Sequence, residues 1–425
     1  MTQVLDHDRR SQSRPTRSHP CRFCGVPLGH TVVDLGMSPP CESFLTAEQL
    51  NEVEPFYPLH LYVCDQCLLV QLPEHVNPHD IFREYAYFSS YSRSWVEHAR
   101  RYTELITERL GLGSESFVVE LASNDGYLLQ HFIERGIRAL GIEPAQNVAT
   151  AAVAKNVPTL MEFFGLELAE QLVHEDQRAD LVVANNVLAQ VPDLNDFVAG
   201  IRTLLAPEGV ATLEFPHLVR LLEGNQFDTI YHEHYSYFSL LSVRRIFAAH
   251  DLVLFDVEEL PTHGGSLRTY FRHKSDVTKP IAPGVASMLA AEVRAGFDRL
   301  PRYLSFGPEV QRAKRRLLTF LILAKEDGKQ VVGYGAPGKG NTLLNYCGIR
   351  TDLLEYTVDR NPYKHGRFLP GTHIPIFEPS RIAETRPDYV LILPWNLRDE
   401  ILQQLAYVRA WGARLVVPIP EVEVI

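Results

Sequence analysis

Apolar runs separated by turn-forming residues predict two sheets of mostly parallel strands, with helices between the strands. A strand buried on both faces is expected to be almost continuously apolar, and three central runs fit this description. They lie at 117–121, 139–142 and 180–184. The first run leads into Asn124, Asp125 and Gly126, which form turns readily, and a helical pattern begins at Tyr127. Doubly wound sheets hold nucleotide-like ligands at such a strand, turn and helix.

Polar residues at the ends of these strands indicate which ligand the first sheet binds. Glu143 ends the second strand, where an acid accepts hydrogen bonds from both hydroxyls of a ribose. The turn lacks the G-x-G-x-x-G pattern that brings bare backbone to a pyrophosphate. Acids and amides suit the sulfonium and amino-acid tail of S-adenosylmethionine better, so we expect this cofactor. The alternative, that each polar residue simply turns the chain, stays open for any one of them. The candidate cofactor ligands are Glu120, Asn124, Asp125, Gly126, Glu143, Asn185 and Asn186.

The C-terminal third contains a second pattern of this kind. Residues 333–338 read G-x-G-x-x-G after an apolar run, and Asp359 ends the next expected strand, 354–358. Another buried strand is expected within 387–395. A phosphate loop is rejected because Gly340 stands where a Ser or Thr should hold magnesium. The pattern predicts a site for a phosphorylated ligand, either NAD or a nucleotide-activated substrate. Its candidate contacts are Gly335, Lys339 and Asp359.

Length and charge narrow the class of protein. The chain has 425 residues, more than the ~250–300 that one core accommodates, so two or three domains are expected. The net charge of −11, from 41 basic and 52 acidic residues, disfavours nucleic acid or an anionic membrane as the partner. Residues 1–20 are polar and arginine-containing, which predicts a disordered tail and no secretion signal. No run approaches the ~18 apolar residues of a membrane helix. We therefore expect a cytoplasmic enzyme.

Four of the six cysteines form two C-x-x-C pairs. They are Cys21, Cys24, Cys64 and Cys67. Two such pairs supply the tetrahedral four-sulfur shell of a structural zinc. The gap of 39 residues between the pairs predicts a small lobe inserted there. Disulfides are the less favoured alternative in a reducing compartment, and a catalytic zinc would need an open coordination position. Cys41 and Cys347 stand alone and are expected to pack in the interior.

Two aromatic clusters are candidates for the substrate site. The first, over 85–92, carries three tyrosines and precedes a helical run over 95–110, and Tyr87 and Ser89 could line a cleft. The second reads Y-H-E-H-Y-S-Y-F-S over 231–239. On a strand, His232 and His234 would share a face and Glu233 would point away, which suits a metal poorly. A histidine beside a tyrosine and a glutamate suits general acid–base catalysis. Core packing remains the alternative for both clusters.

Taken together, these motifs resemble a known family, the S-adenosylmethionine-dependent C-methyltransferases that act on nucleotide-linked deoxysugars in antibiotic biosynthesis. The resemblance runs from Cys21 to the C-terminus and rests on C-R-F-C, V-C-D-Q-C, E-Y-A-Y-F-S-S-Y-S, E-L-A-S-N-D-G-Y-L-L, Y-H-E-H-Y-S-Y-F-S, H-G-G-S-L-R and G-Y-G-A-P-G-K-G-N-T-L-L. It implies an α/β protein with a small N-terminal zinc lobe, a central Rossmann-like class I methyltransferase domain and a second Rossmann-like domain. The expected domain boundaries are 21–78 for the zinc lobe, 79–110 for a helical connection, 111–275 for the methyltransferase domain, 276–328 for a second helical connection and 329–425 for the C-terminal domain.

The resemblance also implies a substrate and catalytic residues. The substrate is expected to be a thymidine diphosphate (TDP) 4-keto sugar, held partly by the C-terminal domain. Tyr231 and His234 match the family's catalytic tyrosine and histidine, Glu233 matches their acidic neighbour, and Tyr85 falls in the matching aromatic cluster. Where the family commonly reads N-V-L-A-H-V-P-D, this chain has Gln190.

A mechanism follows from the acidity of a carbon beside a ketone. His234 would remove the proton, Tyr231 would polarise the oxygen, and Glu233 would orient the histidine. Arg268, in H-G-G-S-L-R, offers a cation to the sugar or phosphate, although a surface arginine beside a plain turn fits equally well. Two other classes stay open: an NAD-dependent sugar-nucleotide oxidoreductase and an inactive zinc-lobed binding protein. The particular sugar, the carbon methylated and the oligomeric state are not determined by the sequence.

Overall fold

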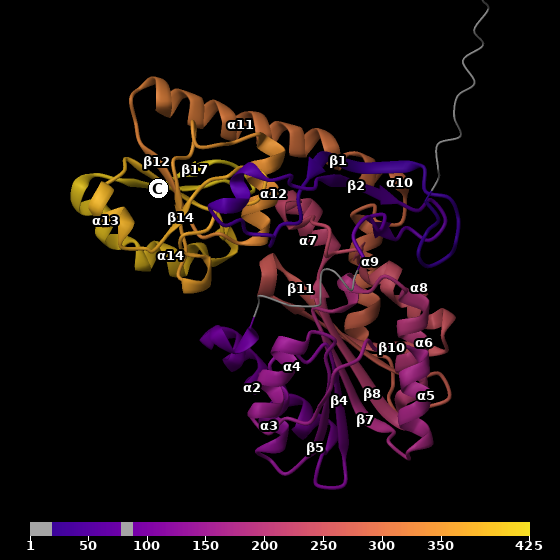
Figure 1. Cartoon of the computed structure of the whole chain (residues 1–425). Helices are drawn as coiled ribbons and strands as arrows, with labels where there is room; N and C mark the ends of the chain where they lie inside the picture. Colours follow the sequence, from indigo (N-terminus) through magenta and orange to yellow (C-terminus); the bar gives the residue numbers. More distant parts are fainter. Residues whose placement is uncertain (1–18, 78–87) are drawn as a thin grey trace, which may run out of the picture.

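The computed structural model describes residues 19–77 and 88–425, and the chain folds around three sheets (Figure 1). The candidate residues Tyr85 and Tyr87 lie outside the described residues. Within the described part of the chain, no helix has the length and apolar character needed to cross a membrane.

The central sheet has seven strands in the order β6-β5-β4-β7-β8-β11-β10. All neighbours from β6 to β8 are parallel, and β11 alone runs antiparallel between β8 and β10. The strand order reverses between β4 and β7, and ligands of such sheets bind beside this switch point. The strands are β4 Phe117–Leu121, β5 Arg138–Ile142, β6 Thr159–Leu160, β7 Ala179–Asn185, β8 Leu205–Pro216, β10 Leu252–Leu260 and β11 Ser266–His273.

Helices cover both faces of this sheet. One face packs on α2 and α3, through Tyr102, Ile106 and Phe132, while α5, α6 and α8 cover the other (Figure 1). The expected helix over 95–110 is therefore present as α2. The helices are α2 Arg93–Leu110, α3 Leu129–Ile133, α4 Gln146–Ala154, α5 Leu166–His174, α6 Leu194–Leu204, α7 Leu218–Glu223 and α8 Leu240–Ala249.

The N-terminal sheet takes its fourth strand from a distant part of the chain. Its order is β1-β2-β3-β9, where β9 (Ser236–Tyr237) belongs to the second aromatic cluster. β9 pairs antiparallel with β3, so the expected small lobe and that cluster form one structure. The remaining strands are β1 His30–Ser38, β2 Tyr57–Val63 and β3 Val70–Gln71.

The C-terminal sheet has six strands in the order β14-β13-β12-β15-β16-β17, parallel except at β17. Its strands are β12 Val331–Tyr334, β13 Thr357–Val358, β14 Ile376–Phe377, β15 Tyr389–Ile392, β16 Arg414–Val417 and β17 Glu423–Val424. Its helices are α12 Gly338–Cys347, α13 Arg381–Thr385 and α14 Arg398–Gln404. Three helices precede it: α9 Pro283–Arg294, α10 Leu300–Leu304 and α11 Phe306–Glu326.

The three sheets do not have separate cores. Apolar residues of β1 and β2 pack with α11 and the C-terminal sheet in one cluster, and α11 runs along β1 (Figure 1). The cysteine end of the N-terminal lobe instead packs with the central sheet, through Cys64, Cys67 and Leu69. This lobe therefore joins the other two parts of the molecule.

Two local expectations differ from the structure. The strand expected over 354–358 shrinks to Thr357–Val358, because the amide of Leu354 bonds the carbonyl of Arg350 in a turn. The H-x-H segment is also not a strand, since the His234 amide donates to the Tyr231 carbonyl at 2.9 Å and closes a turn. Extended structure begins only at Ser236.

Candidate active site and metal centre

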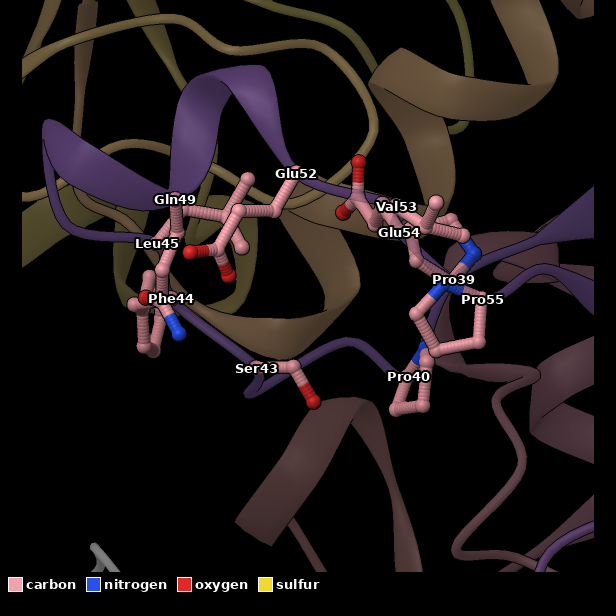
Figure 2. Close-up of a pocket in the computed structure, with 10 residues that line it drawn as sticks. All are labelled: Pro39, Pro40, Ser43, Phe44, Leu45, Gln49, Glu52, Val53, Glu54 and Pro55. Atoms are coloured by element: carbon pink, nitrogen blue, oxygen red, sulfur yellow. The ribbon is translucent and has the colours of Figure 1, made fainter.

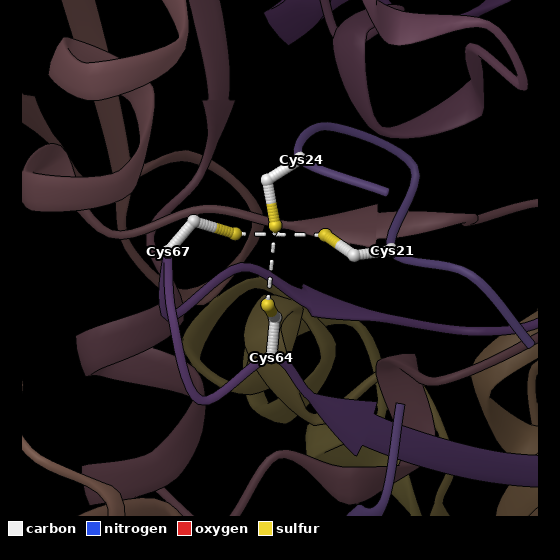
Figure 3. A group of neighbouring side chains, drawn as sticks. All are labelled: Cys21, Cys24, Cys64 and Cys67. Atoms are coloured by element: carbon white, nitrogen blue, oxygen red, sulfur yellow. Dashed lines mark hydrogen bonds between the residues drawn. The ribbon is translucent and has the colours of Figure 1, made fainter. Parts of the chain in front are cut away.

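The four paired cysteines converge on one point (Figure 3). All four Sγ atoms lie within 4.8 Å of one another, and Cys21–Cys67 and Cys24–Cys64 are each 3.5 Å apart. Tetrahedral zinc with Zn–S bonds of about 2.3 Å would hold its sulfurs about 3.8 Å apart. The residues present therefore fit a closed four-thiolate zinc centre, which leaves no coordination position for substrate.

The metal centre is connected directly to the second aromatic cluster. Gln71 donates from Nε2 to Cys21 Sγ at 3.2 Å and accepts from the Arg22 amide at 2.8 Å. Gln71 also pairs with Ser236 in the β3–β9 ladder. The zinc lobe thus fixes the strand that follows His234.

At the carboxyl edge of the central sheet, Glu143 follows β5 as predicted. Its two carboxylate oxygens accept the backbone amides of Asn124 and Ala145 at 2.9 and 2.8 Å. Burial raises the pKa of Glu143, and these two amide bonds oppose the rise. Each oxygen keeps a further lone pair, so the group can still accept from a ribose. The turn after β4 also requires a glycine at position 126. Gly126 has φ +74°, and an added Cβ would lie 2.8 Å from Val157.

Buried polar atoms without partners gather at this same edge. Within residues 19–77 and 88–425, they include Glu120 Oε2, Ser123 Oγ, Asn185 Oδ1 and both side-chain polar atoms of Asn186. Such atoms are costly to bury unpaired, so the site is built for a polar ligand. Burial, then Glu143 and Asp125, raise the pKa of Glu120 well above its ordinary value. A cationic ligand would relieve this concentration of acids, which fits a sulfonium and an ammonium group.

Asp125 and Ser89 have a different setting from the one expected. The Asp125 carboxylate already pairs with Lys155 Nζ at 3.0 Å and accepts from Ser90. The Ser89 amide donates to Asn124 Oδ1 at 2.9 Å, so Ser89 is tied to the cofactor turn. Their roles as ligand contacts stay predictions.

All three parts of the molecule hold the turn that carries Tyr231 and His234. The Ile230 carbonyl, just before the turn, accepts from Thr342 Oγ1 of α12 at 3.1 Å. Just after it, the Tyr235 amide donates to the Ala189 carbonyl at 2.7 Å, beyond β7. The Tyr235 carbonyl accepts from the Leu72 amide of the zinc lobe at 2.9 Å. The turn is therefore fixed where the three sheets meet.

Within this turn, Tyr231 and His234 lie side by side. Their ring centroids are 4.2 Å apart and both side chains are half-buried. Desolvation, together with His263 and Lys339, lowers the pKa of His234 to about 3, against a bond to the Thr229 backbone. The imidazole is therefore neutral near pH 7 and able to accept a proton.

Glu233 does not orient His234, contrary to the expectation. Its Oε1 accepts the Cys41 thiol at 3.8 Å, and its carboxyl is directed towards the zinc-lobe loop that carries Glu42. Burial and the charge of Glu42 raise the pKa of Glu233 to about 8, so the group is protonated at neutral pH. The reason is tertiary, because the zinc lobe brings Cys41 and Glu42 against this carboxyl. Cys41 and Cys347 are both buried, as predicted.

Arg268 lies inside the protein. Its guanidinium pairs with Glu214 at 2.9 Å and Glu258 at 3.2 Å and covers the Tyr102 ring. The side chain is 4% exposed. A substrate-binding role for Arg268 stays a prediction, and its two ion pairs direct its charge to carboxylates of the protein itself.

The G-x-G-x-x-G turn of the C-terminal sheet is filled by protein atoms. An added Cβ at Gly335 would lie 2.6 Å from Pro394, and one at Gly338 would lie 2.8 Å from Cys41 Sγ and 3.0 Å from Glu42 Oε1. The Glu42 carboxylate accepts a hydrogen bond from the Gly338 backbone. The negative charge therefore stands where a pyrophosphate would bind the start of α12. Asp359 accepts the amides of Ala336 and Asn361 at 2.6 and 2.7 Å.

Lys339 extends from the first turn of α12 towards the same junction as His234. Its Nζ donates to Asn396 Oδ1 at 2.8 Å and lies 4.9 Å from the Trp395 ring centroid. Burial lowers the pKa of Lys339, and the nearby Asp228 opposes this. Lys339 thus extends from the C-terminal sheet towards the central sheet.

Sequence reasoning missed a group at the carboxyl edge of β8. Glu214 Oε2 bonds His98 Nε2 at 2.9 Å, and the His98 ring stacks on Trp95 at 4.9 Å. Trp95 lies 6.2 Å from Tyr127, which follows the cofactor turn. The sequence does carry a signal for this group, because Glu214 stands within the apolar run of β8. A buried carboxylate there needs a partner.

A cavity of about 350 Å³ lies in the zinc lobe, apart from these groups (Figure 2). Glu52 and Glu54 line it, so its charge disfavours an anionic nucleotide. Glu54 moreover bonds Gly371 and His373 across the interface with the C-terminal sheet.

Three family models match successive segments of the chain. Residues 21–82 match a model described as "Putative zinc binding domain", residues 94–257 a "Methyltransferase domain", and residues 261–420 a "C-methyltransferase C-terminal domain".

Individual proteins give a consistent result. The C-methyltransferase NovU of Streptomyces niveus is 37% identical over 405 residues, which is 95% of this chain and 96% of that protein. Among solved structures, an S-adenosylmethionine-dependent methyltransferase from Clostridium acetobutylicum covers 42% of this chain and 92% of its own, with 10% identity and a TM-score of 0.35. The CcbJ methyltransferase of Streptomyces caelestis covers 42% and 90%, with 12% identity and a TM-score of 0.34. TM-scores at this level do not bear on the substrate.

Proposed function

Because the chain belongs to the family of C-methyltransferases, we propose that it methylates a carbon beside the ketone of a nucleotide-linked 4-keto deoxysugar. The enzyme is S-adenosylmethionine-dependent and its N-terminal lobe binds zinc. The proposal adds the substrate, a TDP sugar of an antibiotic pathway, and an enolate mechanism. The observation that carries it is the junction where all three sheets hold the turn of Tyr231 and His234.

The residues at this junction suit proton removal from carbon. Burial lowers the pKa of His234 to about 3, so the ring is neutral at pH 7 and has a nitrogen lone pair free for a proton. The same shift makes it a weaker base than an ordinary imidazole, and its position beside Tyr231 is what favours it as the base. The Tyr231 hydroxyl, whose ring lies 4.2 Å from that of His234, can donate to the ketone oxygen. The carbon–hydrogen bond breaks towards His234, and its electron pair delocalises onto the oxygen as an enolate.

The cofactor edge supplies the other reactant. S-adenosylmethionine, when bound, provides an electrophilic methyl group on its sulfonium. Glu143 is the proposed ribose anchor, while Glu120, Asn185 and Asn186 offer polar atoms for its cationic end. The enolate carbon then forms a bond to the methyl group as the sulfur–carbon bond breaks, and the proton on His234 passes to water. Holding both reactants in reach contributes a further rate enhancement.

Lys339 is proposed to hold the diphosphate at the junction of the sheets, beside the turn that Glu42 occupies. Lys339 lies close enough to His234 and Asp228 to lower the pKa of both. Ser89 would act through its hydroxyl. The backbone amides of Gly335 and Asp359 donate to the carbonyls of Val358 and Phe377, so the roles of these two residues stay predictions. No feature of the described residues favours the oxidoreductase, because the Glu42 carboxylate lies against the turn that NAD would use.

The test is a methylation and exchange assay. Wild-type protein with S-adenosylmethionine and a panel of 4-keto TDP sugars should yield a product heavier by one methylene. With S-adenosylhomocysteine in deuterated water, the wild type should exchange the α-hydrogen of the substrate. His234→Asn should bind both ligands but lose turnover by roughly 10²–10⁴, the range for a positioned general base. No methylation of any panel member would contradict the proposal.

A further inference from the structure

The loop between β10 and β11 contains a strained histidine. His263 has φ 53° and ψ 25° within the short helix η5 (Thr262–Gly264). This left-handed conformation is unfavourable for a residue with a Cβ, and glycine adopts it freely. Strain of this kind persists only where the surroundings enforce it, and it is concentrated at functional sites.

The surroundings of His263 hold its backbone on both sides. The Gly264 carbonyl accepts from Gln226 Nε2 at 2.9 Å, and the Gly265 carbonyl accepts from the His217 amide at 3.0 Å. Thr262 Oγ1 donates to Glu214 at 3.0 Å. These bonds use atoms that any residue at position 263 would leave in place. The turn itself therefore does not require a histidine.

The ring lies between the cofactor edge and the His234 turn. It meets Trp95 edge-on at 5.2 Å, and Trp95 in turn lies 6.2 Å from Tyr127, beside the cofactor turn. It is also close enough to His234 to lower the pKa of that residue.

The His263 ring is also available for a ligand. The residue is exposed, and no hydrogen bond to either ring nitrogen is present among the described residues. Desolvation by the surrounding protein, and then the charge of Lys339, lower its pKa to about 4. A neutral imidazole carries one N–H donor at pH 7.

We propose that His263 is a third catalytic residue, whose imidazole N–H donates a hydrogen bond to the ketone oxygen alongside the Tyr231 hydroxyl while His234 removes the proton from the neighbouring carbon. This role rests on the proposed function. The carbon–hydrogen bond breaks, its proton goes to His234, and the electron pair moves onto the oxygen that His263 faces. His263 transfers no proton, and the pair returns to carbon when the new carbon–carbon bond forms. Lys339 is assigned instead to the diphosphate, as its fixed charge suits an anion.

Two substitutions separate chemistry from folding. His263→Gly removes the ring and relieves the strained backbone, so the protein should unfold at a temperature no lower than wild type. Turnover should fall about 10²–10³-fold, as for the loss of one oxyanion donor. His263→Asn tolerates the left-handed backbone and keeps an N–H donor, so it should lose less. The α-hydrogen exchange rate in deuterated water should fall in parallel, with S-adenosylmethionine affinity unchanged by calorimetry.

His373→Gly is the matched control. His373 is also a left-handed histidine, with φ 57°, but it lies on the C-terminal sheet and bonds Glu54. It should retain wild-type turnover.

Three outcomes would overturn the role of His263 while leaving the proposed function intact. The first is wild-type turnover in His263→Gly. The second is an equal loss of turnover in His263→Gly and His373→Gly. The third is that Lys339→Met loses α-hydrogen exchange while His263→Gly exchanges at the wild-type rate. If the wild type itself neither methylates nor exchanges any 4-keto nucleotide sugar, the proposed function fails instead.

Discussion

The chain builds the same strand, turn and helix twice, and the two copies differ in what fills the turn. In the central sheet, β4 leads through Gly126 into α3, and buried polar atoms of Glu120 and Asn185 at the edge have no partners among the residues that the structure describes. In the C-terminal sheet, β12 leads through Gly335 into α12, and protein atoms occupy the turn.

The two turns differ in which carboxylate bonds their backbone. Glu143 holds the first turn by bonding the Asn124 amide and keeps lone pairs for a ligand. At the second turn, the Glu42 carboxylate from the zinc lobe bonds the Gly338 backbone. The first edge is therefore organised for a small cationic cofactor. The second contributes a side chain, Lys339, to the junction between the sheets.

The zinc lobe connects these two edges, so loss of its metal centre should reduce turnover more than any other change. In Cys64→Ser with Cys67→Ser, zinc should be absent, because two of four thiolates are gone, and β3 should no longer hold β9. Displacing the His234 turn by even about 1 Å should reduce turnover roughly 10²-fold or more. Elemental analysis and the methylation assay measure both. Cys347→Ala, at a buried cysteine outside the metal set, should keep its zinc, and zinc retained in the double variant would refute the assignment.

The next prediction compares the contributions of Glu143 and Asp359 to cofactor binding. Glu143→Ala should weaken S-adenosylmethionine binding by about 1.5–3 kcal/mol for each charged hydrogen bond lost, while Asp359→Ala should leave it unchanged. Calorimetry on both variants decides this. Equal losses in the two variants, or tight NAD binding that Asp359→Ala abolishes, would show that the second edge holds a cofactor too.

The pH dependence of stability tests whether Glu233, which lies between the two edges, is protonated. Its pKa, about 8 in the folded protein, lies above that of an ordinary glutamate because burial and Glu42 disfavour its charge. The wild type should therefore lose stability as pH rises from about 4.5 through 8. Glu233→Gln, an isostere of the protonated acid, should escape this loss, a difference of about 1–3 kcal/mol at pH 9. Thermal unfolding at pH 5 and 9 measures it. The exposed Glu162→Gln should follow the wild type, and a pH-independent gap for Glu233→Gln would contradict the protonated state.

The smallest effect is expected at Glu42. Removing its charge with Glu42→Gln should strengthen binding of TDP about 2–5-fold, equivalent to 0.3–1 kcal/mol for a charge at a helix N-terminus. Affinity for S-adenosylmethionine should not change. Glu48→Gln, an exposed acid of the same lobe, is the control for a general change in charge. Weaker TDP binding in Glu42→Gln would mean that the carboxylate helps to hold the nucleotide.

Local patterns predicted the parts of the fold that are local in origin. The strands at Phe117–Leu121, Arg138–Ile142 and Ala179–Asn185, and the helix Arg93–Leu110, follow from apolar periodicity. The cysteine spacing predicted the metal set, because C-x-x-C brings two thiols onto one turn whatever surrounds it. The candidate cofactor acids likewise stand at strand ends, where the topology collects them.

What the sequence alone determined was thus the inventory of strands, turns, thiols and acids. The tertiary structure decided which of these meet. The pairing of Ser236–Tyr237 with β3, the direction of Glu233 towards Cys41, and the strain at His263 all depend on contacts between residues far apart in the chain. Periodicity cannot encode such contacts, because a backbone hydrogen bond or an occupied glycine turn is satisfied by whichever segment the packing brings near. The same G-x-G-x-x-G turn that would accept a phosphate on an open edge instead receives the carboxylate of Glu42, since the zinc lobe folds against it.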